Sequence, residues 1–261
     1  EGDLSTSKSI PLILGSKLKS FKSFGGDRYV ALTVPAGSVA NRAHFLTIDE
    51  TFKVLDEFWF DSNESVSVHD FEVSNNGFFI GGDFSGAVSS EQQLVFSSMQ
   101  QTAFIISADS YGNLSWARSF PSSGVSSIRD VEIDYWGDLL VVQEFSGEIN
   151  HAIGSLVAKG GYDLQLSLLD ADDGGQIWDK HIGGDGNETV NSLKLNSYGT
   201  PFLFFQTSLG LYQDDVAFSQ TTSEEIHGVA LLPKTGLPII TTDKLEIENL
   251  GSFSFQLNAL H

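Results

Sequence analysis

A repeated hairpin pattern is the feature that most constrains the fold of this chain. Three copies match closely: "VHDFEVSNNGFFIGGDFSG" from Val68 to Gly86, "IRDVEIDYWGDLLVVQEFSG" from Ile128 to Gly147, and "VNSLKLNSYGTPFLFFQTSLG" from Val190 to Gly210. Weaker copies run from Leu18 to Gly37 and from Ile226 to Asp243. In each copy two apolar runs, at least one of them alternating, flank a tight turn, which predicts a β-hairpin.

A second kind of hairpin alternates with the first. It is seen from Thr102 to Phe120 and from Tyr162 to Gly184, and more loosely from Ala43 to Phe60. The matching turn glycines Gly77 and Gly137 are 60 residues apart, and 62 residues separate Gly137 from Gly199. About four strands therefore recur in each unit, which is typical of β-propeller blades.

Three segments, "GDLLVVQEFSG", "GNLSWARSF" and "AIGSLVAKGGYDLQLSLLDADDGGQIWDKHIGGDGNET", resemble the bacterial SBBP-type β-propeller repeat. The resemblance covers residues from about 45 to 210. It implies four strands per blade, in sequential order from the axis outward. It also implies a module of a secreted or surface protein, and it brings no catalytic residues.

The two ends of the chain suggest how such a ring closes. A strand from Ser9 to Ser16 precedes the first hairpin, and a strand from Gly251 to Leu260 lacks a partner. Their pairing would close the ring and remove open sheet edges. We therefore expect one complete β-propeller domain over residues 1–261, of five blades with one reduced to "LYQDDVAFSQTT". In the alternative, the hairpin from Ile226 to Asp243 is an outer one and the ring has nearer four blades.

Composition narrows the class of protein further. The 34 acidic and 14 basic residues give a net charge of −20, which disfavours nucleic acid and anionic membranes as partners. The chain has no cysteine, so disulfides and thiolate chemistry are excluded, and no apolar run has the roughly 20 residues of a membrane helix. We expect a monomeric, secreted or cell-surface bacterial domain, a mature or excised part of a longer protein, without a cofactor.

Five potential hydrogen-bond donors align on the predicted inner strands and form the candidate ligand site: Lys19, His69, Arg129, Asn191 and His227. Donors that converge on an axis can bind a carboxylate, a sulfate or sugar hydroxyls. Three positions further along stand Lys22, Glu72, Glu132 and Lys194. Here Lys22 would neighbour Glu72 and Glu132 would neighbour Lys194, which favours charge pairing over ligand binding. Long connections at residues 87–101 and 148–161 lie at the expected binding face.

Two chemical alternatives receive weaker support. The stretch "LLDADDGGQIWD" invites a calcium site, but Asp170, Asp172 and Asp179 fit the spacing of a calcium loop only loosely, and we predict no metal. Inner-strand carboxylates offer candidates for a glycan-cleaving enzyme: Asp70, Glu72, Asp130 and Glu132. No nucleophile or metalloprotease motif is present, and we predict no catalytic residues.

The tryptophans divide into two groups. Trp59, Trp116 and Trp178 are expected to cover blade interfaces, whereas Trp136 lies in a hairpin turn on the face opposite the long connections. We expect Trp136 to pack on an adjacent blade or on a neighbouring domain. The sequence thus predicts a non-catalytic binding or adhesion module that recognises a glycan or peptide at the axial face, with a passive spacer and a glycan-cleaving enzyme as alternatives.

Overall fold

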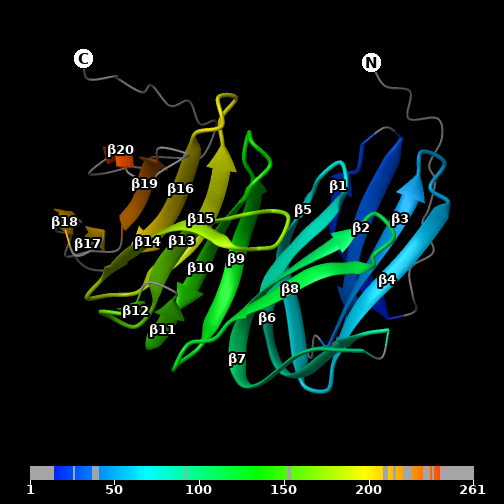
Figure 1. Cartoon of the computed structure of the whole chain (residues 1–261), viewed down its shortest axis with the longest axis horizontal. Helices are drawn as coiled ribbons and strands as arrows, with labels where there is room; N and C mark the ends of the chain where they lie inside the picture. Colours follow the sequence, from blue (N-terminus) through cyan, green and yellow to red (C-terminus); the bar gives the residue numbers. More distant parts are fainter. Residues whose placement is uncertain are drawn as a thin grey trace.

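The computed structural model describes residues 15–25, 27–36, 41–91, 93–151, 154–207, 211–213, 216–219, 225–231, 236 and 238–241. Within these ranges every regular element is a β-strand (Figure 1), so the expected all-β class is confirmed. No helix able to span a membrane occurs in this part of the chain.

Sixteen of the strands form four units, each of four antiparallel strands in sequential order. Unit 1 contains β1 (Ser16–Ser23), β2 (Arg28–Pro35), β3 (Arg42–Asp49) and β4 (Val54–Ser62). Unit 2 contains β5 (Ser65–Val73), β6 (Gly77–Ser90), β7 (Gln93–Asp109) and β8 (Leu114–Phe120). Unit 3 contains β9 (Ser126–Ile133), β10 (Leu139–Phe145), β13 (Asp163–Leu169) and β14 (Gln176–Gly184). Unit 4 contains β15 (Glu188–Leu195), β16 (Pro201–Thr207), β19 (Glu225–Leu231) and β20 (Pro238–Thr241).

The long second-to-third connections form hairpins of their own. In unit 2, β6 and β7 extend past the sheet, and β6 pairs there with the end of β4, with Asp61 opposite Ser89. This pairing joins units 1 and 2 into one sheet. In unit 3 the connection contains the two-stranded hairpin of β11 (Glu148–His151) and β12 (Gly154–Val157).

Two assignments that supported a count of five units are wrong. The "LYQDDVAFSQTT" segment forms β17 (Leu211–Gln213) and β18 (Val216–Ser219), which add to the outer strand β14 of unit 3 and do not form a reduced blade. The hairpin expected from Ile226 to Asp243 contains β19 and β20, and β19 pairs with β16. It is therefore the outer hairpin of unit 4, as in the alternative interpretation. Both proposed closing segments, from Ser9 to Ser16 and from Gly251 to Leu260, lie outside the described residues except for Gly15 and Ser16.

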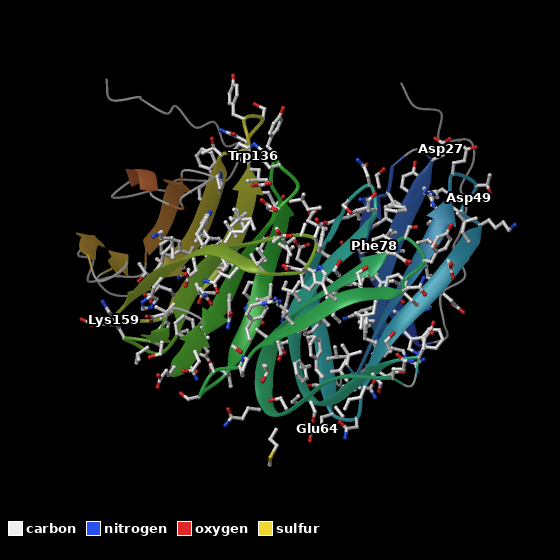
Figure 2. All side chains as sticks on the ribbon, viewed as in Figure 1. Asp27, Asp49, Glu64, Phe78, Trp136 and Lys159 are labelled. Carbon is white, nitrogen blue, oxygen red and sulfur yellow. The ribbon has the colours of Figure 1, made fainter. Side chains whose placement is uncertain are left out.

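The hairpins within each unit share a turn chemistry that explains their local folding. The turn residues Asp109, Asp134, Asp170 and Asn196 each accept a backbone N–H two residues later through a side-chain oxygen. This Asx arrangement favours a tight turn. Because neighbouring strands are antiparallel, these turns lie at one end of each sheet, and the second-to-third connections lie at the other. Figure 2 labels Trp136 and Asp49 in turns toward the top of the view and Glu64 in a connection between units at the bottom. We call these the turn end and the connection end.

The core consists of layers between neighbouring units. Phe45, Phe58, Phe71 and Phe78 are buried together between units 1 and 2, and the rings of Phe45 and Phe58 stack at 4.8 Å. Separate apolar clusters join units 2 and 3 and units 3 and 4. In unit 3 every residue of the central strands β10 and β13 is buried. Because neighbouring units pack on one another, their first strands β1, β5, β9 and β15 lie side by side.

Candidate functional site

A β-bulge recurs in the first strand of every unit. The pairing register skips one residue in β1, β5, β9 and β15, and the skipped residues are Lys19, His69, Arg129 and Asn191. A bulge bends the strand and redirects the side chain of the extra residue. Four of the five predicted donors therefore occupy one equivalent, structurally special position.

The fifth predicted donor, His227, is not in this set. It lies on β19, opposite Phe205, and β19 is the third strand of unit 4. The alignment that placed His227 on an inner strand was therefore wrong, because it treated an outer hairpin as an inner one. The side chain of His227 is outside the described part of the chain.

Three of the four bulge residues bind acceptors within the protein. Lys19 donates to the carbonyl of Val68 in the next unit. His69 Nε2 lies 2.5 Å from Asp83 Oδ2, and Arg129 Nε donates to Glu144 Oε2 at 2.6 Å. Burial lowers the pKa of Lys19, against the nearby Asp83 carboxylate, which favours the charged form. Asn191 is exposed.

The acceptors Asp83 and Glu144 were missed in the sequence, although a signal for them exists. They begin the matching stretches "DFSG" and "EFSG", so both units place an acid beside a basic bulge residue. Each acid also reaches the next unit. Asp83 accepts the Ser127 hydroxyl at 2.8 Å, and Glu144 accepts the Val190 N–H at 2.8 Å. These carboxylates thus connect the units as well as holding the donors.

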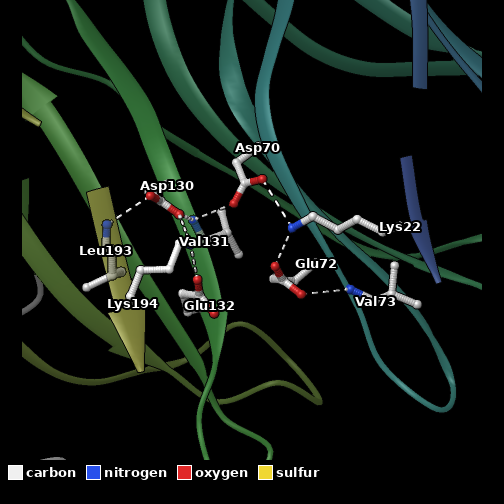
Figure 3. Close-up of polar contacts among 9 residues, drawn as sticks. All are labelled: Lys22, Asp70, Glu72, Val73, Asp130, Val131, Glu132, Leu193 and Lys194. Atoms are coloured by element: carbon white, nitrogen blue, oxygen red, sulfur yellow. Dashed lines mark hydrogen bonds and ion pairs between the residues drawn. The ribbon is translucent and has the colours of Figure 1, made fainter. Parts of the chain in front are cut away.

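A second set of polar contacts lies three residues further along the first strands (Figure 3). Lys22 forms an ion pair with Glu72 and lies 3.3 Å from Asp70. Lys194 forms an ion pair with Glu132. The expected pairing of complementary neighbours is confirmed at both places.

Asp70 and Asp130 each form a hydrogen bond to the first strand of the next unit. Asp70 accepts the N–H of Val131 at 3.2 Å, and Asp130 accepts the N–H of Leu193 at 2.9 Å (Figure 3). Burial raises the pKa of Asp130 to about 7, and the neighbouring Asp70 carboxylate acts in the same direction. A carboxyl pair of this kind resembles an acid–base pair chemically. Here, however, both carboxylates accept backbone N–H groups of the adjoining strand, which is a structural role.

Two cavities lie at opposite ends of this row of first strands. At the connection end, a cavity of about 310 Å³ is lined by Arg129 and Glu144, together with Gln101, Tyr162 and Thr189. At the turn end, a cavity of about 730 Å³ lies between units 2 and 3 and is lined by Glu72, Glu132 and Trp136, among others. The first contains Arg129, one of the predicted donors. The second contains Trp136, which the sequence placed on the face opposite the long connections.

The acidic stretch considered for calcium forms a turn. Asp170 Oδ1 accepts the N–H of Asp172 at 2.8 Å, and Asp179 Oδ2 accepts the side chain of Gln165 at 3.2 Å. Among the residues that the structure describes, no cluster of three metal-ligating side chains occurs.

The expected covering of unit interfaces is clearest at Trp116. Its Nε1–H donates to the carbonyl of Ala171 in unit 3 at 2.9 Å, and its ring lies 6.1 Å from Phe79. The turn glycine Gly174 lies directly against this ring, and Gly236 lies against Trp178 in the same way. Aromatic rings of one unit therefore pack on turn glycines of the next. Comparison with known protein-family models and with curated proteins found no match for the chain.

Proposed function

We propose that the four units belong to a β-propeller closed by pairing of the segments at Ser9–Ser16 and Gly251–Leu260. The sequential order of strands within each unit and the apolar layers between units support this arrangement. A test is to introduce Ile13→Cys and Phe253→Cys into this cysteine-free chain. A disulfide within one molecule supports closure, and failure of several neighbouring cysteine pairs to bridge contradicts it.

We further propose that the domain is a non-catalytic binding or adhesion module of a secreted or cell-surface protein, and that it recognises a glycan at the connection end. The cavity that contains Arg129 carries this proposal. It combines donors and acceptors from the first strands with Tyr162 and Gln101 from the long connections. Sugar hydroxyls need both kinds of partner, and an aromatic ring can contact the apolar face of a sugar. A peptide is the second ligand class for the same pocket.

The passive spacer is a second candidate, because one observation favours it. Lys19, His69 and Arg129 already bind acceptors of the protein, so they need no ligand to satisfy them. Catalysis receives less support, since Asp70 and Asp130 bind backbone N–H groups.

The test is a glycan-array screen with and without calcium, followed by calorimetry with any hit. Tyr162→Ala and Gln101→Ala are the informative variants, because Arg129→Ala would leave the buried Glu144 without its ion-pair partner. Tyr111→Ala is the matched control, since Tyr111 is exposed in a turn at the opposite end. Loss of binding in the first two variants alone supports the pocket. No binding to any glycan or peptide supports the spacer, and sugar release that depends on Asp70 or Asp130 would establish the enzyme.

A further inference from the structure

The cavity at the turn end has a wall chemistry different from that of the proposed glycan pocket. It lies between units 2 and 3 and holds about 730 Å³. Phe79 and Ile133 contribute apolar surface to it, Asn75 and Asn76 contribute amides, and Trp136 forms part of its wall. The two cavities share no lining residue, so each can be tested without the other.

The charged residues that line this cavity all have the same sign. They are Glu72, Glu132 and Asp172, and no basic side chain lines it. Lys22 and Lys194 compensate the two glutamates through ion pairs. No ion pair to Asp172 is found among the described residues. The wall formed by unit 3 therefore carries negative charge that the protein does not neutralise locally.

Further carboxylates lie close to this wall. Asp138 follows the turn that contains Trp136. Burial raises the pKa of Asp138, and the carboxylates of Asp134, Asp170 and Asp172 raise it further. A cation placed in this cavity would lower the electrostatic energy of all four acids, whereas an anion would raise it.

Trp136 is held in place as part of this wall. Its backbone N–H donates to Asp134 Oδ1 at 2.8 Å, and its ring meets Tyr135 edge to face at 5.8 Å. Its side chain is nonetheless 52% exposed. An indole ring and carboxylates that line one cavity are a favourable environment for an ammonium group, because the ring quadrupole and the acids attract the same charge.

We propose that the cavity at the turn end binds a ligand that carries an alkylammonium group, with Trp136 as the aromatic surface and Asp172 as the counter-charge. A lysine side chain of a peptide and a small free amine share this chemistry. The net charge of −20 would also attract such ligands from a distance. This site shares no residue with the glycan pocket or with the two segments proposed to close the ring, so its test does not depend on either proposal.

The experiment is calorimetry on the whole chain at low salt with two probes, the peptide acetyl-Gly-Lys-Gly-amide and butylammonium chloride. The peptide with an acetylated lysine side chain is the neutral control. We expect the acetylated peptide to bind at least about fivefold more weakly, and Trp136→Ala and Asp172→Asn each to weaken the charged probes by about fivefold. Binding of both probes identifies the ammonium group as sufficient; binding of the peptide alone shows that its backbone contributes.

Two control variants separate a local site from diffuse attraction. Tyr198→Ala removes an exposed ring from the matching turn of unit 4, and Glu148→Gln removes one charge at the connection end. Both should bind the probes like the unmodified chain. The proposal is overturned if neither charged probe binds, if the acetylated peptide binds equally well, or if Glu148→Gln weakens binding as much as Asp172→Asn. Trp136 is half exposed, so we expect Trp136→Ala to fold, and circular dichroism can verify this.

Discussion

Replacement of Gly174 by alanine tests the packing of one unit on the next. Gly174 has a φ of +70°, and a Cβ built there would lie 2.8 Å from Cζ3 of Trp116. The ring cannot move away freely, because its Nε1–H is bound to the Ala171 carbonyl. The left-handed backbone costs an alanine about 1–2 kcal/mol, and forcing a methyl group into a packed interface costs about 1–3 kcal/mol more. We expect Gly174→Ala to lower the free energy of unfolding by about 2–5 kcal/mol.

Gly137 provides the matched control for this substitution. Its φ is +96°, but a Cβ at this position would meet nothing within 4 Å. Gly137→Ala should therefore show only the backbone cost of about 1–2 kcal/mol. Guanidinium titrations followed by circular dichroism give both values under the same conditions. Equal losses in the two variants, or a smaller loss for Gly174→Ala, would refute the idea that contact with the Trp116 ring makes this glycine necessary.

Three further predictions concern buried charge and interface contacts. Burial raises the pKa of Glu188 to about 7 from an ordinary 4.5, so the folded state retains a proton that the unfolded state has lost, and stability should fall as pH rises from about 5 to 8. Glu188→Gln cannot ionise, so its decline in denaturation midpoint over that range should be shallower; an unchanged slope would contradict the shift. A double-mutant cycle with Lys22→Met and Glu72→Gln should give a coupling free energy of about 1 kcal/mol in stability, and a value near zero would mean that the ion pair does not stabilise the fold. Trp116→Phe keeps an aromatic ring but loses one hydrogen bond between units and part of the indole packing, so a loss of at least about 1 kcal/mol in unfolding free energy is expected, and no loss would show that neither contact stabilises the interface.

Much of the local structure was predictable because hairpins are encoded locally. Alternating apolar residues and turn residues such as Asp134 and Gly137 are contiguous in the sequence, and the hairpins predicted from them occur in the structure. The ion pairs of Lys22 with Glu72 and of Lys194 with Glu132 followed from the repeat as well. Equivalent positions in repeated units come to lie side by side, so opposite charges at one position predict a contact.

The candidate sites were only partly predictable. Alignment brought Lys19, His69, Arg129 and Asn191 to one position, but it did not reveal the bulge there or the acceptors that three of them bind. A bulge depends on the register between two strands, which no single strand determines. The cavity beside Trp136 arises only where two units meet, so neither unit shows it alone.

The sequence by itself determined the strands and turns of the repeated hairpins. The tertiary structure decided which sheet each hairpin joins: β17 and β18 extend unit 3, and β19 and β20 complete unit 4. The physical reason is that a hairpin forms from its own turn and pairing, whereas its place in a sheet depends on free backbone groups at a distant strand edge and on the apolar surface available there. Those partners are far apart in the sequence, and a similar pattern fits an inner or an outer position.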